Sequence, residues 1–423
     1  MRPLTAADKR DTGLYVDWQS ELGVDDVKVR LIHAIARGRG QAITHLFTGH
    51  RGVGKTTELY RVKQRLESGV EGQRFLVSML LAEEWLDLAD MQPEDLIFQV
   101  VRQLVADLRT AGFDLAATKF GEFFRRLREE FNKIVGLEAI EVGVDPLKFK
   151  FKLQDLSTAR REFRRLLQGQ LPKVYDLVNG EILGNARKWL AKNGYADDIL
   201  IIVDEIDRIP LKLIGEMGSN HENLFIGSAG TLRALDCGVL YTVPIELAYS
   251  RRQVSLRDIY GTEIRTLPVM PVVDSSGRTH AGHQVLRRIV ERRTAAAGLD
   301  LAELCDPPEL LDHVLSASGG HVRTLLVLLR SMLDRVERLP IHRTVVERGL
   351  RGAAADLARP LSSRDWVLLD QVHATKKPMN GDNSSDWNRL LRDSYVFAYY
   401  EDPLGFWYDR NPLLDYVDNR GRP

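Results

Sequence analysis

Short apolar segments alternate with longer amphipathic ones through the first 250 residues of this 423-residue chain. Helical patterns occupy residues 27–35 and residues 93–108, where Pro93 and acidic residues stand in the first turn. Four further segments are largely apolar, as in strands buried on both faces: residues 42–47, 74–81, 198–207 and 238–247. This alternation predicts an α/β fold with a parallel sheet covered by helices on both faces.

A glycine-rich segment, GHRGVGKTT, follows the first predicted strand at residues 49–57. It matches the pattern G-x-x-x-x-G-K-[ST], in which loop N–H groups and the N-terminus of the next helix hold phosphates. Lys55 is expected to bridge the β- and γ-phosphates, and Thr56 to offer its hydroxyl to Mg²⁺. The predicted ATP-binding residues are Gly49, His50, Arg51, Gly52, Val53, Gly54, Lys55, Thr56 and Thr57.

Two acids, Asp204 and Glu205, end the third predicted strand, ILIIVDEID. Ligands of open α/β sheets bind outside the carboxyl ends of the strands, which is where both acids are expected. Asp204 is predicted to hold Mg²⁺, and Glu205 to polarise the water that attacks the γ-phosphate. The sequence therefore predicts an enzyme that hydrolyses ATP to ADP and phosphate.

The two motifs together resemble those of the AAA+ and STAND branch of P-loop ATPases, most closely origin-recognition-type initiators and bacterial STAND ATPases. The resemblance runs over roughly residues 14–415. It implies that Thr242, at the end of the fourth strand, senses the γ-phosphate. It also implies that Arg323, in SGGHVRTLLVLL, is a lid arginine that touches the nucleotide, and that Tyr15 and Val16 contact adenine.

Each implied role has a structural alternative that the residues leave open. Thr242 could be an ordinary buried strand hydroxyl, and Arg323 could simply stand at the opening of an amphipathic helix. Tyr15 and Val16 could anchor the N-terminal segment to the core.

Three arginines follow the fourth strand in the region where AAA+ chains carry an arginine finger. They are Arg251, Arg252 and Arg257. A finger would reach the nucleotide of a neighbouring subunit, whereas a solvated arginine face is the alternative for each residue.

The pattern and the resemblance predict three domains. Residues 1–275 form the P-loop ATPase domain, residues 276–355 a helical lid, and residues 356–423 a winged-helix-like domain. The last domain contains two helices that begin at serine caps, then an aromatic hairpin turning at EDPLG.

A long insertion, about residues 110–180, separates the two nucleotide motifs. Its centre, IEVGVDPLKFKFKL at 140–153, alternates apolar residues with lysines and predicts a hairpin with a lysine-rich face. Residues 119–165 carry 12 Lys and Arg against 8 Asp and Glu. This modest excess fits a solvated face, with a partner or nucleic-acid contact as the alternative.

Charge favours a protein partner over DNA. The whole chain carries 59 Lys and Arg against 59 Asp and Glu, and residues 356–423 carry 9 against 11. The predicted wing has Glu401, Asp402 and Asp409 against Arg410 alone. Since phosphate contacts dominate non-specific DNA affinity, the acidic wing favours a latch or protein-contact role.

Other chemistry in the sequence is sparse. His280 and His283 form an H-x-x-H pair without further candidate ligands, so no metal site beyond Mg²⁺ is expected. Cys237 and Cys305 are expected in the core of a reduced protein. With no apolar leader and no apolar segment of membrane-spanning length, the chain is expected to be cytoplasmic.

Two functions from different classes fit these features. In the first, the chain is a signalling ATPase whose nucleotide state controls self-assembly or a separately encoded effector. The STAND resemblance suggests bacterial antiphage defence as its setting. In the second, it is a DNA-binding initiator-like or transposition-regulating AAA+ ATPase. The neutral charge and the acidic wing favour the first.

Overall fold

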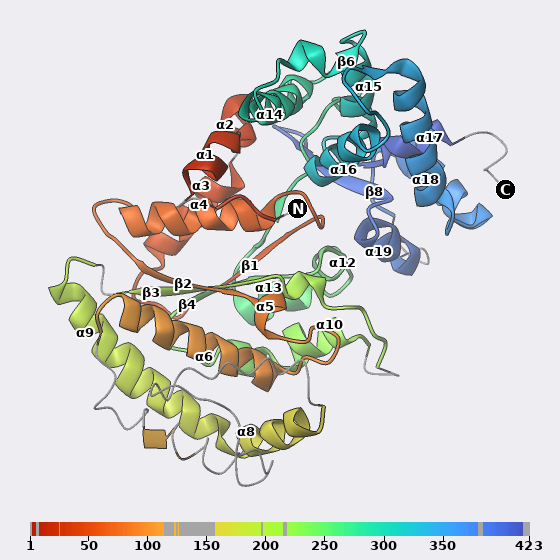
Figure 1. Ribbon diagram of the computed structural model, residues 1–423. Coiled ribbons are helices and arrows are strands. Elements are labelled where there is room, and N and C mark those ends of the chain that lie inside the picture. The colour runs from red at the N-terminus through yellow and green to blue at the C-terminus, as the bar shows by residue number, and fades with distance from the viewer. Residues whose placement is uncertain are drawn as a thin grey trace. The chain divides into compact units, whose positions relative to one another are not determined.

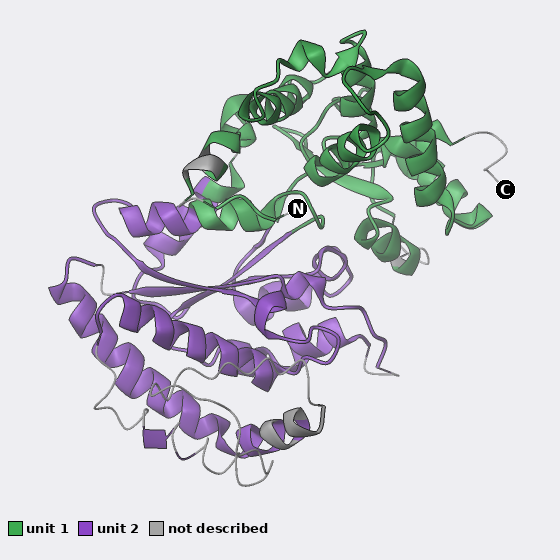
Figure 2. Ribbon diagram, in the orientation of Figure 1, with its two compact units in different colours: residues 1–28, 49–61, 266–423 green, residues 29–48, 62–265 purple. Residues whose placement is uncertain are grey.

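The structure of the protein is a computed structural model, which describes residues 2–5, 8–24, 26–113, 122–123, 126, 157–195, 198–214, 218–379 and 384–417. The chain separates into two compact units, each assembled from several segments (Figure 2). Unit 1 comprises residues 1–28, 49–61 and 266–423, and unit 2 comprises residues 29–48 and 62–265. The lysine-rich hairpin predicted at 140–153 lies outside the described residues.

A five-stranded sheet runs through unit 2 in the order β2-β3-β4-β1-β5 (Figure 1). Parallel pairing joins β2 to β3, β3 to β4 and β4 to β1. The strands are β1 (Thr44–Gly49), β2 (Leu76–Leu81), β3 (Ile199–Asp204), β4 (Gly238–Thr242) and β5 (Ile264–Leu267). The four predicted strands are confirmed. The sequence did not predict β5, because Arg265 and Thr266 interrupt its apolar pattern.

The register aligns the ends of the strands that carry the candidate chemistry. Tyr241 of β4 is opposite Leu46 of β1 on one side and Val203 of β3 on the other. Because the strands are parallel, their carboxyl ends reach the same edge of the sheet. Asp204 and Thr242, each one residue beyond this row, are therefore both at that edge.

Helices cover both faces of the sheet, as predicted (Figure 1). On one face lie α3 (Val27–Arg37) and the second half of α4 (Lys55–Ser68). On the other lies α6 (Pro93–Thr110), packed against β2 and in turn against α8 (Ser157–Leu177). A π-helical turn continues α8 into α9 (Gly184–Lys192). The shorter helices are α5 (Ala82–Trp85), α10 (Asn220–Glu222), α11 (Ala229–Leu232), α12 (Ile245–Ala248) and α13 (Gln253–Tyr260).

The core between the sheet and α6 is formed by apolar side chains that the sequence pattern already placed there. Ile201 and Val203 of β3 pack with Val101, Leu104 and Leu108 of α6 in one buried cluster. The helix begins with Pro93 at its first position, and the side chains of Gln92 and Asp95 complete a capping box. The α/β fold class expected from the sequence is confirmed.

Unit 1 is largely helical. Its N-terminal segment carries α1 (Lys9–Leu14) and α2 (Trp18–Leu22). The predicted lid region contains α14 (Gly282–Ala296), α15 (Leu310–Ala317), α16 (Val322–Leu333) and most of α17 (Arg343–Ala358). A short parallel pair, β6 (Cys305–Asp306) with β7 (Ile341–His342), ties α15 to α17. Among the described helices, none is both long enough and apolar enough to cross a membrane.

The C-terminal part of unit 1 has the predicted sequence of elements. Ser362 caps α18 (Ser363–Thr375) in a capping box with Asp365, and α19 (Ser384–Arg392) follows. The antiparallel hairpin of β8 (Val396–Glu401) and β9 (Gly405–Arg410) comes last. Two helices and a hairpin are thus confirmed, while the winged-helix identity and the domain boundaries at 275 and 355 stay predictions.

Candidate nucleotide-binding site

The glycine loop joins the end of β1 to the start of α4, which is the strand–loop–helix arrangement of a P-loop. Its glycines adopt backbone angles that other residues rarely take, with φ of 153° at Gly49, 99° at Gly52 and 110° at Gly54. A Cβ on Gly49 would stand 2.6 Å from the carbonyl oxygen of Leu267. The curled loop therefore depends on glycine for its conformation and for its close packing.

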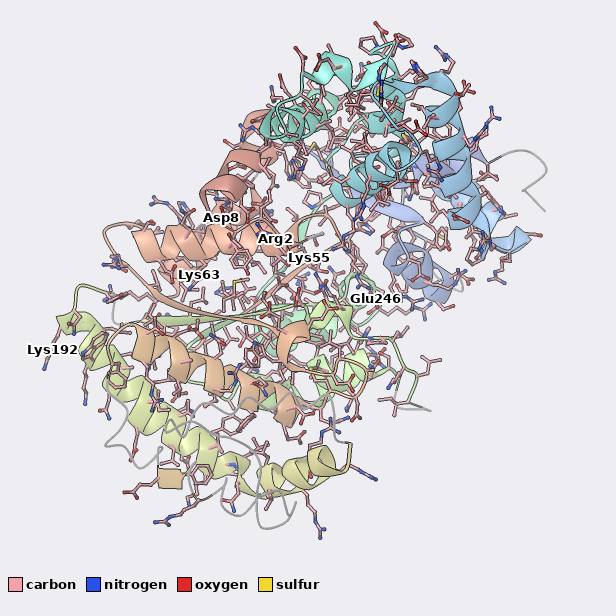
Figure 3. The ribbon with its side chains drawn as sticks, in the orientation of Figure 1. Arg2, Asp8, Lys55, Lys63, Lys192 and Glu246 are labelled. Carbon is pink, nitrogen blue, oxygen red and sulfur yellow. The ribbon has the colours of Figure 1, made fainter. Side chains whose placement is uncertain are left out.

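Lys55 is the first residue of α4 and is labelled in Figure 3. Its Nζ donates to the carbonyl oxygens of Gly49 at 2.7 Å and His50 at 3.0 Å, and the residue is buried. Thr56 is buried beside it, and Thr57 Oγ1 accepts a hydrogen bond from the Leu4 N–H. The loop thus holds a cationic group over a backbone that ends at a helix N-terminus, which is a combination suited to phosphate.

Helix α16, in the predicted lid region, contacts the loop directly. His321, its N-cap residue, accepts a hydrogen bond at Nδ1 from the Thr324 N–H and donates from Nε2 to the Arg51 carbonyl oxygen at 3.0 Å. A Cβ built on Gly52 would lie 2.8 Å from the His321 ring and 2.9 Å from the Arg323 side chain. Arg323 therefore packs its aliphatic part on the loop, next to the residues predicted to bind ATP.

The N-terminal segment is bonded to α4 through a buried polar network. The Tyr15 hydroxyl donates to Glu58 at 3.0 Å and accepts from Lys28 Nζ at 3.1 Å, and the Arg61 guanidinium lies 4.2 Å from the ring centre. Burial raises the pKa of the Tyr15 phenol, so the hydroxyl stays protonated. Tyr15 therefore anchors this segment, as does the buried Val16. Their predicted adenine contact stays a prediction.

In unit 2, β3 ends at Asp204 and the backbone turns sharply at Glu205, whose φ is 71°. The Glu205 N–H donates to Asp204 Oδ1 at 2.7 Å, and the Glu205 side chain is only 8% exposed. Arg208, one helical turn further on, pairs with Glu205 Oε1 at 2.9 Å and also with Glu83. A left-handed conformation at a glutamate is costly and typical of functional sites.

The Glu205 carboxyl has a perturbed pKa. Burial raises it to about 7, Arg208 opposes the rise, and the charges of Asp204 and Glu83 add to it. A carboxylate with a pKa near 7 can accept a proton from water far more readily than an ordinary exposed glutamate. A raised pKa is compatible with the predicted role of Glu205 as general base, which stays a prediction.

Thr242 ends β4 and is fully buried. Its hydroxyl has no hydrogen-bond partner among the described residues, whereas the Thr48 hydroxyl on neighbouring β1 donates to the Val243 carbonyl oxygen at 2.8 Å. Since buried polar groups are nearly always hydrogen-bonded, an unsatisfied hydroxyl at the ligand edge of a sheet is compatible with the predicted γ-phosphate contact.

The remaining candidate residues occupy ordinary positions. Arg251, Arg252 and Arg257 are exposed at and beside α13, and Arg252 Nε lies 3.3 Å from Glu222. Their assignment as an arginine finger stays a prediction. His280 contacts the Pro271 carbonyl oxygen and the Gly282 N–H, and no group of three metal-ligating side chains occurs within the described ranges. Both cysteines are buried and free.

Sequence reasoning missed two contributions. Arg208 pairs with Glu205 from the next turn, and its spacing of three residues was the available signal. His321 joins α16 to the loop, and its place between Gly320 and the apolar start of α16 indicated a helix cap. Neither signal says which distant residue the side chain meets.

No protein-family model and no curated protein matches the chain. Among solved structures it is similar to the ORC2 protein of Aeropyrum pernix in ADPNP–ADP complexes, with 12% identity, 98% of each chain covered and a TM-score of 0.40. It is also similar to a Walker-type ATPase of Pyrococcus abyssi, with 13% identity, 98% of each chain covered and a TM-score of 0.46. A RuvB mutant of Thermotoga maritima has 13% identity over 93% of this chain and 95% of its own, with a TM-score of 0.37.

The fold and both motifs agree on one class. A parallel sheet covered by helices, a glycine loop between β1 and α4, and an acidic strand end on β3 together form the α/β fold and the strand–loop–helix arrangement that the sequence predicted.

Proposed function

We propose that this chain is an ATP-hydrolysing switch of the AAA+ and STAND class, whose nucleotide state controls self-assembly or a separately encoded effector. The observation that carries the proposal is the loop between β1 and α4. Its glycines have positive φ, the Lys55 amino group lies over it, and Arg323 of α16 packs on Gly52. Loops of this construction bind the phosphates of nucleotides.

ATP would engage the loop through the side chains at the start of α4. Lys55 would exchange the carbonyl oxygens of Gly49 and His50 for oxygens of the β- and γ-phosphates. The Thr56 hydroxyl and the Asp204 carboxylate are oxygen donors of the kind Mg²⁺ prefers, so they fit its binding. When bound, Mg²⁺ would neutralise negative charge on the phosphates.

Glu205 would act as the general base for hydrolysis. It accepts a proton from the water whose oxygen attacks the γ-phosphorus, while the bond to the bridging oxygen breaks and ADP and phosphate result. Its pKa of about 7 suits this step. Thr242, at the end of β4, would contact the γ-phosphate. Arg323, in α16, would contact the nucleotide and so make the position of the predicted lid depend on it.

The C-terminal helices and hairpin would present the output of the switch to a protein. Most cations there are already paired within the same unit. Lys376 and His373 both contact Asp409, Arg389 pairs with Asp365, and Arg410 pairs with acidic neighbours. Arginines neutralised in this way offer little to DNA phosphates, which supports a protein contact over the initiator-like alternative. Antiphage defence rests on the STAND resemblance alone.

Two lysines on one helix test the nucleotide site. Lys55→Ala should weaken ATP binding by about 10- to 100-fold, because charge-assisted hydrogen bonds to phosphate are lost. Lys63→Ala is the matched control, since Lys63 on the same helix pairs with Glu67 (Figure 3). Binding of a fluorescent ATP analogue and phosphate release would be measured. Equal affinities of the two variants would exclude the loop as the ATP site.

The switch itself is tested by solution mass. Glu205→Gln protein, expected to hold ATP without turning it over, would be measured by light scattering in Mg-ADP and then in Mg-ATP. A defined oligomer in ATP alone would support control of self-assembly. A protein that stays monomeric in both nucleotides would exclude control of self-assembly. Control of a separately encoded effector would then be the remaining proposal.

A further inference from the structure

The nucleotide loop has a second set of neighbours that the proposed chemistry does not use. Within unit 1, His321 and strand β8 of the C-terminal hairpin contact loop residues 50–52, which include His50. We call this group the loop clamp and define it as His50, His321, Phe397 and Ala398. All four residues are buried.

The hairpin is hydrogen-bonded to the loop. The N–H of Ala398, in β8, donates to His50 Nε2 at 3.0 Å, across 348 residues of sequence. The Ala398 carbonyl oxygen accepts from the Val269 N–H at 2.9 Å, just beyond β5. The backbone of Ala398 is therefore hydrogen-bonded both to His50 of the loop and to Val269, two residues after β5.

Phe397 fills the space between the two histidines. Its ring stacks on His321 with centres 5.4 Å apart and planes 5° apart, and it meets His50 edge-on at 5.5 Å. His321 in turn donates to the Arg51 carbonyl oxygen. The loop is thus fixed at two successive residues, His50 through β8 and Arg51 through the cap of α16.

Both histidines are neutral at ordinary pH. Burial is the main cause that lowers the pKa of His321 to about 4 and holds that of His50 well below its usual range. A neutral imidazole has one donor and one acceptor nitrogen, which fits donation from His321 Nε2 to Arg51, acceptance at His321 Nδ1, and acceptance at His50 Nε2. The contact is therefore a fixed neutral element beside a site for anions.

Gly319 and Gly320, directly before α16, pack closely against the hairpin and the segment that follows β5. The Tyr399 hydroxyl donates to the Gly319 carbonyl oxygen at 2.8 Å. A Cβ on Gly319 would come within 3.0 Å of Phe397 and Tyr399, and one on Gly320 would overlap the Met270 carbonyl oxygen at 1.6 Å. This packing leaves the hairpin little freedom to move without displacing His321.

We infer that the loop clamp makes the C-terminal hairpin a positioning element of the nucleotide site. The hairpin holds residues 50–52 in the conformation that accepts phosphates, so nucleotide binding and hairpin order are coupled. The coupling is reciprocal, because any contact that favours the binding conformation is itself favoured by the bound nucleotide. The inference rests on the proposed function in assuming that this loop binds ATP.

A substitution that retains the helix cap isolates the clamp. In His321→Asn the amide oxygen can still cap α16, but the stacking on Phe397 and the bond to Arg51 are lost. The affinity for fluorescent ADP should fall about tenfold. His342→Asn is the matched control, since His342 is the exposed N-cap residue of α17 in the same unit.

An independent measurement follows amide hydrogen exchange in the hairpin by mass spectrometry. In the wild-type protein, saturating Mg-ADP should slow exchange of peptides that contain the Ala398 amide, and His321→Asn should reduce this protection. Peptides from α17 serve as the internal reference. Lower affinity without any nucleotide effect at the hairpin would overturn its positioning role.

Two more conservative variants, one test and one control, are used if His321→Asn does not fold. Tyr399→Phe removes the bond to Gly319, whereas Tyr400→Phe alters the next residue of the same strand, which packs on Phe406. Tyr399→Phe alone should weaken ADP binding, by a few-fold. Equal affinities with an unaffected hairpin would overturn the inference while ATP binding stands. A wild-type protein that binds no nucleotide would instead refute the proposed function, and the inference with it.

Discussion

The two predicted halves of the ATP site are held by different forces. The glycine loop of unit 1 takes its conformation from backbone angles and close van der Waals packing, with Gly52 against the His321 ring and the aliphatic part of Arg323. The acidic end of β3 in unit 2 is organised by charge, with Glu205 buried between Asp204 and Arg208. Changes of shape should therefore damage the loop, and changes of charge should damage the acids.

The largest effect is expected from the charge of Glu205. Glu205→Gln keeps the shape of the side chain but cannot accept a proton, so turnover should fall about 10²- to 10⁴-fold. ATP affinity should change little, because the loop is untouched. Phosphate release and nucleotide binding are the measurements, with the partly exposed Glu67→Gln on α4 as control. Hydrolysis at the wild-type rate would remove Glu205 as the base.

Shape at the loop is tested by two glycines that differ in their surroundings. Gly54→Ala introduces a Cβ that meets nothing within 4 Å, so it should cost about 1–2 kcal/mol of stability from backbone strain alone. Gly52→Ala adds the clash with His321 and Arg323 and should cost about 1–3 kcal/mol more. Thermal unfolding of the nucleotide-free protein compares them. Equal losses would mean that packing does not shape the loop.

Two threonines on adjacent strands separate stability from function. Thr48→Val should destabilise the protein by about 1 kcal/mol, because the bond to the Val243 carbonyl oxygen is lost. Thr242→Val removes a buried hydroxyl without a described partner, so stability should hold or rise slightly while turnover falls. Denaturant unfolding and ATPase rates give both quantities. Unchanged turnover in Thr242→Val would assign that hydroxyl to the core.

The smallest expected effect is a displacement of the pH profile. Glu205 must be ionised to act as a base, and its pKa is about 7, so kcat/KM should rise as pH increases through 7 and level off above it. Arg208→Ala removes the charge that lowers this pKa, so the rise should move to higher pH.

The control for this profile is Arg252→Ala, an exposed arginine that pairs with Glu222. Its profile should overlay that of the wild type. A profile for Arg208→Ala that stays in place or moves to lower pH would show that Arg208 does not set the Glu205 pKa.

The elements that the sequence predicted well are those with local causes. Apolar residues 199–203 of β3 could only be buried, and the spacing of Gly49, Gly54 and Lys55 identified the loop. Serine caps and an aromatic hairpin pattern likewise located α18 and β8. The short strand β5, with two polar residues in four, carried too weak a pattern to be recognised.

The sequence by itself determined the class of fold, the glycine loop and the acidic strand end, because apolar periodicity and glycine spacing act over a few neighbouring residues. Only the tertiary structure decided what surrounds them. The bond from His321 to Arg51 spans 270 residues, and that from Ala398 to His50 spans 348. Such contacts depend on packing and backbone geometry that no local pattern encodes. The same reason explains why the Glu205 pKa, raised by burial and partly lowered again by Arg208, is perturbed only in the folded protein.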